Sequence, residues 1–363
     1  MKRIEKITIK AKKPRVVVGL SGGVDSSVTA ALLVEQGYEV IGVFMKNWSQ
    51  DVGDFVCAWS EDLADARRVA QILDLRFYVW NFEEEYRQGV IDYFFREYKA
   101  GRTPNPDIMC NQEIKFKVFL SKAKEFGADY VATGHYARVV KKNEDYSLLK
   151  GRDNSKDQTY FLYTLKQEQL AKTIFPLGDL QKSSVRKLAK KFNLPTYNKP
   201  DSQGICFIGE VDIRALLKQR LKPKKGKIVY IDGSVLGEHE GAVFYTLGQR
   251  GGLELSGGPY YVVAKDMKKN LVIVSDNPQD PLLWRRECIV KDLSLTKERE
   301  LPKKITAVIR YRHPAQEATV KRIDNKTIKL TFKEAQRAIT PGQAAVFYDQ
   351  DEVLGGGVID RVL

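Results

Sequence analysis

The stretch GLSGGVDSS, Gly19 to Ser27, decides the fold. The apolar run Arg15–Val18 before it predicts a short buried β-strand, and the segment Val24–Gln36 predicts a helix. The motif therefore joins a strand to a helix N-terminus, where unpaired backbone N–H groups and the positive end of the helix dipole attract phosphate. Gly22 and Gly23 let the backbone turn tightly and approach a ligand. An ordinary turn between a strand and a helix would need the glycines, but not the serines or the carboxylate that accompany them.

This loop is not a Walker A loop, because no Gly-Lys-Ser/Thr sequence ends it. It resembles the SGGxDS pyrophosphate loop of the PP-loop ATP pyrophosphatases, enzymes that cleave ATP between the α- and β-phosphates and adenylate a carbonyl-type oxygen. The resemblance implies that the whole loop binds ATP, and Asp25 is predicted to reach Mg²⁺ directly or through water, since this cation prefers oxygen ligands. The ATP-binding residues so implied are Gly19, Leu20, Ser21, Gly22, Gly23, Val24, Asp25, Ser26 and Ser27.

The composition is that of a globular protein, with room for two or three domains in 363 residues. The formal net charge of +14 favours a polyanionic partner, most commonly nucleic acid, although charge that serves solubility alone is the alternative. Four scattered cysteines, no CxxC pair and three histidines argue against a zinc site and fit a reducing, cytoplasmic location. No apolar run reaches the ~20 residues of a membrane span, and the basic N-terminus lacks the apolar region of a secretory signal.

Between Arg15 and about Tyr136, apolar runs alternate with helical patterns, which predicts an α/β domain with a parallel sheet between two layers of helices. Ligands of such sheets bind beyond the carboxyl ends of the strands, where Gly19–Ser27 lies. Met45 ends the second strand at this edge and is predicted to lie near an adenine, with plain core packing as the alternative. The predicted strands are Arg15–Val18, Glu39–Met45, Phe77–Trp80 and Tyr130–Thr133, and the further predicted helices are Glu61–Leu73, Glu83–Tyr98, Phe116–Phe126 and Lys182–Phe192.

The pattern changes near Glu210. After the basic run Lys218–Lys227, short β runs predict a small central domain, and evenly spaced strands after Pro278–Trp284 predict a C-terminal β-barrel. The predicted division is a tail at 1–14, the catalytic PP-loop domain at 15–209, the central β-rich domain at 210–283 and the barrel at 284–363. The predicted β runs are Ile228–Ile231, Ala242–Thr246, Tyr260–Ala264, Leu271–Ser275, Thr306–Tyr311, Glu317–Ile323, Thr327–Phe332, Ala344–Tyr348 and Val353–Ile359.

Two cysteines stand in loop-like motifs. Pro104 and Pro106 exclude a helix through Arg102–Asn111, so Cys110 is predicted at the end of a rigid loop, just before a new helix. A cysteine at a helix N-terminus has a lowered pKa and is more thiolate at neutral pH. A half-buried cysteine that caps the helix is the alternative. Cys206 follows a second glycine-containing loop and, taken alone, is typical of a small buried apolar residue.

Together, these motifs resemble those of the tRNA-specific 2-thiouridylases, over the range from Arg15 to Ile359. The two cysteine motifs are far more specific than the ATP loop. The segments that carry the resemblance are GLSGGVDSS, TPNPDIMCNQEIKF (Thr103–Phe116), ATGHYAR (Ala132–Arg138), KDQTYFL (Lys156–Leu162), DSQGICFIG (Asp201–Gly209), YTLGQR (Tyr245–Arg250) and RYRHP (Arg310–Pro314).

The resemblance implies a two-stage reaction on tRNA. ATP adenylates the 2-oxygen of the wobble uridine in tRNAs for Lys, Glu and Gln, and sulfur then replaces that oxygen, with AMP and pyrophosphate released. Cys206 would carry the sulfur as a persulfide delivered by a cysteine desulfurase or a sulfur-relay protein. Cys110 would attack the bridging sulfur or free hydrosulfide, which leaves a Cys110–Cys206 disulfide to be reduced. Cys57 and Cys288 lie outside the motifs and are predicted to be structural.

The resemblance also assigns binding residues one position at a time. Met45 and Gly134 would join the loop in binding ATP, and the central domain would contact tRNA. Asn105, Pro106 and Asp107 would meet the target base, which must be extruded from the stacked anticodon. The implied tRNA contacts are His135, Lys156, Asp157, Gln158, Arg310, Tyr311 and Gln343.

Two other functions fit part of the sequence. Another PP-loop ATP pyrophosphatase acting on RNA, such as a tRNA-lysidine synthetase, would need the loop but no persulfide cysteine. A non-catalytic RNA-binding protein with a vestigial nucleotide loop would need only the basic surface. An iron–sulfur cluster is disfavoured by the absence of CxxC, although two motif cysteines with a third ligand could hold one.

Overall fold

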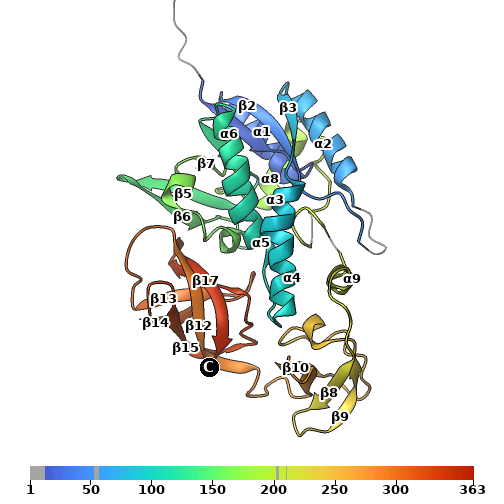
Figure 1. The fold of residues 1–363 in the computed structure, drawn as a ribbon. Coiled ribbons are helices and arrows are strands. Elements are labelled where there is room, and N and C mark those ends of the chain that lie inside the picture. Colours follow the sequence, from blue (N-terminus) through green and yellow to red (C-terminus); the bar gives the residue numbers. More distant parts are fainter. Residues whose placement is uncertain (1–12, 53–56, 202–203, 210) are drawn as a thin grey trace, which may run out of the picture.

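The computed structural model describes residues 13–52, 57–201, 204–209 and 211–363 (Figure 1). The predicted tail therefore lies outside the described residues, except for Lys13 and Pro14. The catalytic domain is built on a parallel five-stranded sheet of order β3-β2-β1-β4-β7, which confirms the predicted α/β class. The strands are β1 Arg15–Gly19, β2 Glu39–Lys46, β3 Arg76–Asn81, β4 Tyr130–Ala132 and β7 Thr173–Ile174.

Both faces of this sheet are buried, and alternate residues of β1 serve the two sides. Val16 and Val18 pack with Leu63 and Val185 in one cluster, whereas Val17 faces the other, so the strand is apolar throughout. Helices α1 Val24–Glu35, α2 Trp59–Ile72 and α8 Lys182–Lys191 cover the first face. The second is covered by α3 Glu83–Tyr86, η1 Arg87–Ile91 and α4 Asp92–Lys99, and by α5 Pro106–Met109, η2 Cys110–Phe119 and α6 Leu120–Glu125.

The prediction of a loop through Arg102–Asn111 is wrong, because a helix begins inside it at Pro106. Proline is tolerated at the first helical position, where its missing N–H would have no partner in any case. Asn105 is the N-cap, and its Oδ1 accepts hydrogen bonds from the backbone N–H groups of Asp107 (3.1 Å) and Ile108 (3.3 Å). Cys110 therefore lies in the second turn of a helix and not in front of its first residue.

A β-hairpin links the catalytic domain to the barrel. Its strands, β5 Ala137–Lys142 and β6 Asp145–Lys150, follow β4, and Leu149 of β6 pairs with Glu352 of β17. After the hairpin, the segment from Lys156 forms only the short 3-10 turn η3, Thr159–Phe161, followed later by α7, Gln167–Leu170. The Asp157 carboxylate accepts bonds from the N–H of Gly151 (3.0 Å) and the hydroxyl of Thr159, which keeps the chain in a turn.

The central domain is a small sheet of order β10-β11-β8-β9 with helix α9, Ile213–Lys218, before it. Its strands are β8 Gly226–Tyr230, β9 Val235–His239, β10 Tyr261–Asp266 and β11 Leu271–Ser275. The predicted strand Ala242–Thr246 is wrong, because the segment forms the 3-10 turn η4, Ala242–Phe244, held by a bond from Ala242 N–H to Asn270 Oδ1 (3.0 Å). Strand β9 escaped prediction, because most of this edge strand is exposed and it lacks apolar alternation.

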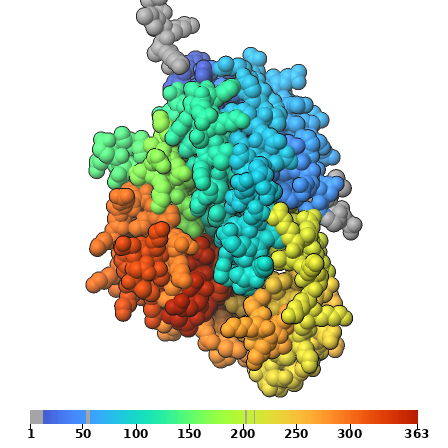
Figure 2. Space-filling view, viewed as in Figure 1, coloured from blue at the N-terminus to red at the C-terminus, as the bar shows by residue number. Residues whose placement is uncertain are grey.

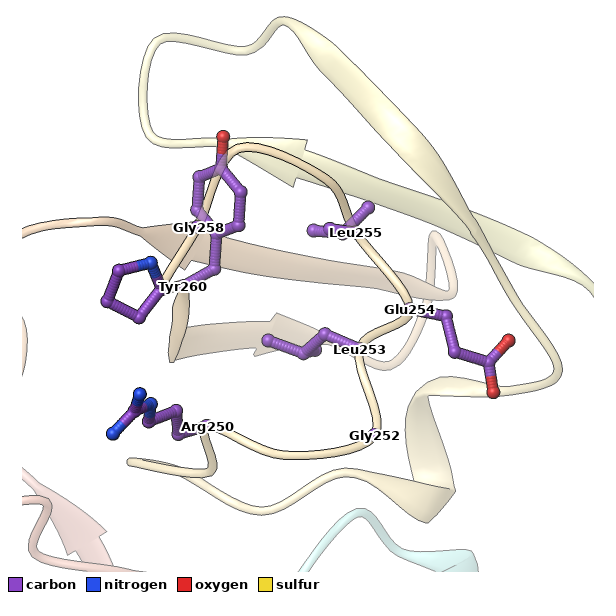
Figure 3. Close-up of a pocket in the computed structure, with 8 residues that line it drawn as sticks. Arg250, Gly252, Leu253, Glu254, Leu255, Gly258 and Tyr260 are labelled. Carbon is purple, nitrogen blue, oxygen red and sulfur yellow. The ribbon is translucent and has the colours of Figure 1, made fainter.

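An open pocket of about 410 Å³ lies in the central domain (Figure 3). None of its lining residues belongs to the loop Gly19–Ser27 or to the cysteine motifs. They are Arg250, Gly252, Leu253, Glu254, Leu255, Gly258, Pro259 and Tyr260.

The C-terminal part is an antiparallel barrel, as predicted, and it has six strands, of which β12 was not among the predicted β runs. The strand order is β12-β15-β14-β13-β16-β17, and pairing of β12 with β17 closes the barrel around a core that includes Cys288 and Phe347. The strands are β12 Trp284–Leu295, β13 Lys304–Val308, β14 Gln316–Arg322, β15 Ile328–Arg337, β16 Ala344–Asp349 and β17 Glu352–Val362.

The barrel and the central domain lie side by side, and both contact the catalytic domain at the end of α4 (Figure 2). Gly101, just after α4, is so close to the central domain that a Cβ there would lie 2.6 Å from Met267 Cγ. Within the described ranges, no helix has both the length and the apolar character needed to cross a membrane.

Candidate active site

The loop between β1 and α1 is closed by its own serines. Ser26 Oγ accepts from the backbone N–H of Ser21 (3.1 Å), and the hydroxyls of Ser26 and Ser27 donate to the carbonyl of Gly23 (3.1 and 2.7 Å). Gly22 has φ +75°, and a Cβ there would lie 2.3 Å from the carbonyl oxygen of Asp62, so only glycine fits. No side chain caps α1 at Gly23, which leaves its first N–H groups open to an anion.

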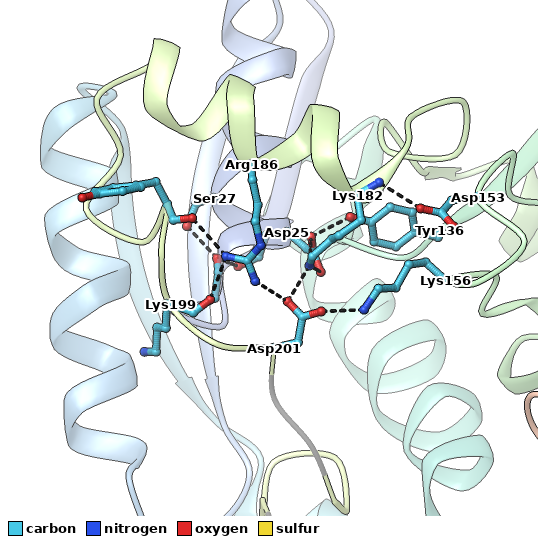
Figure 4. Close-up of polar contacts among 12 residues, drawn as sticks. Asp25, Ser27, Tyr136, Asp153, Lys156, Lys182, Arg186, Lys199 and Asp201 are labelled. Carbon is cyan, nitrogen blue, oxygen red and sulfur yellow. Dashed lines mark hydrogen bonds and ion pairs between the residues drawn. The ribbon is translucent and has the colours of Figure 1, made fainter.

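Asp25, at the start of α1, is held by two partners. It accepts a hydrogen bond from Tyr136 Oη (2.8 Å), and both its oxygens accept from Lys182 Nζ (2.8 Å each) (Figure 4). The carboxylate that is the predicted route to Mg²⁺ is therefore paired with Lys182 in this structure. Among the described residues, no group of three or more His, Cys, Asp or Glu side chains could hold a metal ion.

Lys182 also joins the loop to the segment that leads to Cys206. Its ammonium pairs with Asp201 (2.7 Å), which in turn pairs with Lys156 (2.7 Å) and Arg186 (2.9 Å) (Figure 4). Burial would raise the pKa of Asp201, but hydrogen bonds from Lys156 and Lys182 outweigh it and lower this pKa to about 2. This ionic cluster places Asp201 next to the residue that holds the ATP-type loop.

Met45 and Gly134 pack directly on the loop. Met45 is buried in the core, and its Cε would lie 2.9 Å from a Cβ at Gly19; its position near an adenine stays a prediction. A Cβ at Gly134 would lie 2.9 Å from the backbone of both Asp25 and Ser26. Gly134 is thus required for close contact between β4 and the first turn of α1, whatever its part in nucleotide binding.

The structure brings together the two motif cysteines, which lie 96 residues apart in the chain. Cys110 Sγ is 3.5 Å from Cys206 Sγ, and both thiols are free. Cys110 is fully buried and Cys206 is partly buried. The Cys206 backbone is fixed at both ends of its peptide, since its N–H donates to Asp107 Oδ1 (2.8 Å) and its carbonyl accepts from Tyr86 Oη (2.7 Å).

The pKa values of the two thiols are shifted in opposite directions. Burial and the hydrogen bond to Cys206 raise the pKa of Cys110 well above that of a free thiol. The same hydrogen bond lowers the pKa of Cys206 against the effect of burial, with help from the ammonium of Lys115. The prediction that Cys110 is an activated thiolate is therefore wrong for this state, because the residue is buried inside a helix instead of preceding it. Of the two, Cys206 is therefore the thiol whose pKa is lowered, and Cys110 donates a hydrogen bond to it.

The predicted target-base residues have structural tasks as well. Asn105 Oδ1 caps α5, Pro106 is the first residue of that helix, and Asp107 accepts from the Cys206 backbone. Asn105 and Pro106 precede Cys110 by one helical turn or slightly more. All three residues are half-buried next to the cysteine pair.

The predicted tRNA contacts are largely engaged inside the protein. Lys156 pairs with Asp201, and Gln158 Oε1 accepts from the N–H of Tyr136 (3.0 Å). The Tyr311 ring packs on that of Phe161 with 4.4 Å between centroids, which brings the KDQTYFL and RYRHP segments together. Asp157 lies in the turn described above, Arg310 is half-buried and His135 is buried. The side chain of Gln343 donates to the carbonyls of Thr103 (2.9 Å) and Pro104 (3.3 Å).

Three family models match successive parts of the chain. The tRNA methyl transferase HUP domain covers residues 14–210, the tRNA methyl transferase PRC-barrel domain 214–276, and the aminomethyltransferase beta-barrel domain 285–359. The tRNA-specific 2-thiouridylase MnmA of Listeria monocytogenes serotype 4b (strain CLIP80459) is 52% identical over 96% of this chain and 95% of that protein. The protein of the same name from Halalkalibacterium halodurans is 50% identical over 98% of both. This chain belongs to the tRNA-specific 2-thiouridylase family.

Similarity to solved structures is weaker. A 4-thiouridine synthetase in complex with RNA and ATP covers 54% of this chain and 45% of that chain, at 19% identity and a TM-score of 0.35. The family assignment therefore rests on the sequence relatives.

Several residues of this 2-thiouridylase site were not predicted. Tyr136, Asp201 and Lys115 lie inside the motifs that carry the family resemblance, so their position was a signal. Lys182 and Tyr86 lie outside every motif, and no pattern in the sequence marks them. Their importance follows only from contacts with Asp25 and with the Cys206 backbone.

Proposed function

We propose that this chain forms 2-thiouridine in tRNA, by ATP-dependent activation of the 2-oxygen of the wobble uridine and its replacement by sulfur. The observation that carries this proposal is the contact between Cys110 and Cys206 at 3.5 Å in a protein with an open ATP-type loop. Two of the matching family models carry the name tRNA methyl transferase, but methyl transfer would not need a pair of neighbouring cysteines. Adenylation explains the loop, because a uracil carbonyl oxygen leaves poorly until it is part of AMP.

In the activation step, the uridine 2-oxygen attacks the α-phosphorus of ATP and pyrophosphate leaves. The open N–H groups at the start of α1 would bind the departing phosphates, and the serine hydroxyls would keep the loop in shape. Lys182 lies at the same helix start, paired with Asp25, where its ammonium can balance part of the phosphate charge.

The sulfur step assigns different tasks to the two thiols. The Cys206 thiolate attacks the outer sulfur of a donor persulfide, so that Cys206 gains that sulfur and the donor leaves as a thiolate. The terminal sulfur then attacks C2 of the adenylated uridine, and AMP leaves. Cys110 attacks Cys206 Sγ and breaks its bond to the transferred sulfur, which leaves 2-thiouridine and a Cys110–Cys206 disulfide that a thiol reductant must reopen. Release of hydrosulfide by Cys110 before attack on C2 is the second order of events.

The covalent geometry of the chain supports a common site. Asp201 contacts Lys182, which contacts Asp25 in the ATP loop. Cys206 is five residues further along, and five extended residues span at most about 18 Å. The thiolate is thus tethered within reach of the loop, so that one bound uridine could meet both.

Further parts of this proposal concern the substrate and the setting. The domain boundaries would lie near residues 210 and 284. Asn105–Asp107 would receive the extruded base, and a cysteine desulfurase or relay protein would supply the sulfur. A cytoplasmic location suits the four free thiols. The proposed tRNA contacts are His135, Lys156, Asp157, Gln158, Arg310, Tyr311 and Gln343.

The test separates the two stages in one reaction. The protein is incubated with ATP, Mg²⁺, sulfide and unmodified tRNA, and both pyrophosphate release and 2-thiouridine are measured, the latter by mass spectrometry. Cys206→Ser and Cys110→Ser should each lose 2-thiouridine formation when a persulfide donor replaces sulfide, while tRNA-dependent pyrophosphate release continues. Cys288→Ala, in the barrel core, is the control and should retain both reactions.

The outcome also discriminates among functions. Full 2-thiouridine formation by Cys206→Ser with a persulfide donor would refute the proposed sulfur route. Pyrophosphate release without any thiolated product would favour another PP-loop enzyme acting on RNA. Binding of tRNA with no pyrophosphate release would favour a non-catalytic RNA-binding protein.

A further inference from the structure

Lys115 lies beside the cysteine pair, and the chemistry described above assigns it no task. Its Nζ is 3.4 Å from Nε2 of His135 and 5.6 Å from the centre of the Phe207 ring. The charge of the ammonium also acts on the Cys206 sulfur, which the Cys110 thiol approaches to 3.5 Å. A cation taken out of water is costly unless it is paired, so Lys115 requires a negative partner at this place.

The π-helical form of η2 explains how Lys115 reaches that sulfur. Cys110 and Lys115 are five residues apart, and in an α-helix five residues of ~100° each would place them about 140° apart around the axis. In a π-helix the backbone bonds run from i to i+5, which brings these positions close to one line. The wider turn therefore presents the thiol and the ammonium on one side of the helix, toward Cys206.

The groups around Cys206 identify Lys115 as its counter-charge. The thiol of Cys110, the carboxylate of Asp107 and the phenol of Tyr86 face it from the same helix and from α3. Asp107 disfavours a thiolate, and Tyr86 is neutral. Among the described groups whose charge acts on Cys206, Lys115 is the cation.

A chain of buried polar groups orients this ammonium. His135 Nδ1 is 2.7 Å from Thr133 Oγ1, and both side chains are buried. When Nδ1 carries the ring proton and donates to Thr133, Nε2 is free to accept from Lys115. Burial and the charge of Lys115 hold the pKa of His135 well below its ordinary value, so the ring stays neutral and can accept.

Lys115 itself remains protonated. Burial lowers the pKa of its ammonium, but Cys206, Cys110 and Asp107 together raise this pKa above its ordinary value. The charge that Cys206 needs is therefore present at neutral pH.

We propose that Lys115 is the residue that keeps Cys206 as a thiolate ready to accept sulfur, and that His135 is a positioning residue that directs the Lys115 ammonium. This inference rests on the proposed function, because it names the residue that activates the sulfur acceptor. It also gives the buried His135 a task inside the protein, in addition to the tRNA contact proposed above.

The test measures the reactivity of Cys206 in the free full-length protein, under reducing conditions and without tRNA. Iodoacetamide labelling of the Cys206 peptide is followed by mass spectrometry from pH 5 to pH 9. Lys115→Gln, which keeps a hydrogen-bond donor but removes the charge, should move the labelling midpoint up by about one pH unit or more, so that labelling near pH 7 slows roughly tenfold. Lys115→Arg should stay near the wild-type midpoint.

Lys117→Gln is the matched control. It removes a lysine from the same helix whose ammonium is exposed and pairs with Glu113 at 2.6 Å, and it should leave the midpoint unchanged. His135→Phe should move the midpoint in the same direction as Lys115→Gln, whereas His135→Gln, which retains an acceptor, should move it less.

A wild-type midpoint in Lys115→Gln would overturn the proposal. If Lys115→Gln does not fold, the other variants decide. An unchanged labelling midpoint in His135→Phe would overturn the positioning role of His135. A midpoint of Lys115→Arg near that of the wild type would support the role of the Lys115 charge, and a midpoint raised by about one pH unit or more would refute it. Pyrophosphate release with tRNA is recorded in parallel. Its absence in the wild-type protein would contradict the proposed function, but it would not alter the labelling result.

Discussion

At the scale of single residues, the site is governed by charges that are paired inside the protein. Asp201 is the centre of one group, with Lys156, Lys182 and Arg186 around its carboxylate. Cys206 is the centre of the other, with Cys110 donating to it. Both acidic groups have lowered pKa values, because the charged form of each receives more hydrogen bonds and positive charge than burial costs it.

The Asp201 cluster predicts a pH dependence of stability. The pKa of Asp201 is lowered from 3.8 to about 2 in the folded protein, so its contribution is fully present above about pH 4 and is lost as the pH falls toward about 2. In urea titrations, the difference in unfolding free energy between wild type and Asp201→Asn should be larger at pH 6 than at pH 3. Asp179→Asn, which removes an exposed partner of Arg152, should change stability little. An Asp201→Asn difference that is the same at both pH values would contradict this.

At the scale of secondary structure, the helix that begins at Pro106, with Asn105 as its N-cap, determines the position of Cys110. The sequence predicts a loop at this point because prolines usually interrupt helices. Pro106, however, occupies the first helical position, which favours proline. The π-helical stretch that follows could not be predicted, since no residue pattern in Cys110–Phe119 marks it. It aligns Cys110 with Lys115, and an ordinary α-helix would not.

Asn105 combines a cap with a proposed contact to the base, and substitutions can separate the two. Asn105→Ala should lower the free energy of unfolding by about 1 kcal/mol, because the N–H groups of Asp107 and Ile108 lose their acceptor. Asn105→Ser keeps a capping oxygen and should retain most of that stability in the same urea titration. If Asn105 also holds the base, Asn105→Ser should still form 2-thiouridine more slowly. Equal thiolation by Asn105→Ser and wild type would limit the residue to the cap.

At the scale of the whole molecule, three domains meet at the loop before the cysteine helix. Thr103 donates its N–H to Pro341 of the barrel (2.9 Å), and its hydroxyl is 3.1 Å from that of Thr246 in the central domain. A Cβ at Gly342 would lie 2.9 Å from the Thr103 backbone, and Gln343 binds the next carbonyls. The position of Asn105, and hence of Cys110, therefore depends on both β domains.

Removal of the Gln343 side chain should show whether its hydrogen bonds to the Thr103 and Pro104 carbonyls matter for the cysteine site. Gln343→Ala should slow 2-thiouridine formation about tenfold at saturating tRNA, since the loop loses two hydrogen bonds to its carbonyls, while the KM for ATP stays unchanged. It should also alter iodoacetamide labelling of Cys206 in the absence of tRNA. Gln336→Ala is the control, because that side chain donates only to the nearby Glu334 carbonyl (2.9 Å). A raised KM for tRNA with unchanged labelling would instead make Gln343 a tRNA contact.

Much of the architecture could be predicted from local pattern. Four of the five parallel strands, the helix after GLSGGVDSS and the C-terminal barrel follow from apolar periodicity and turns. Strand β7 has only two residues, and β9 is an exposed edge, so neither carries enough apolar signal. The segment Ala242–Thr246 is the opposite case, since a strand is predicted where the structure has a 3-10 turn. The short apolar run of this turn is typical of a strand when it is judged from sequence alone.

The sequence by itself determined the ATP-type loop, the importance of Cys110 and Cys206, and the family, because these depend on residue types at fixed spacing. Only the tertiary structure decided which of the two thiols has the lowered pKa. That property depends on burial, on the hydrogen bond from Cys110 and on the charge of Lys115, and both residues are distant from Cys206 in the chain. It also decided that Asp25 in GLSGGVDSS is held by Lys182, more than 150 residues away. Local sequence carries backbone preferences, whereas a pKa is set by whatever the fold places within a few ångströms.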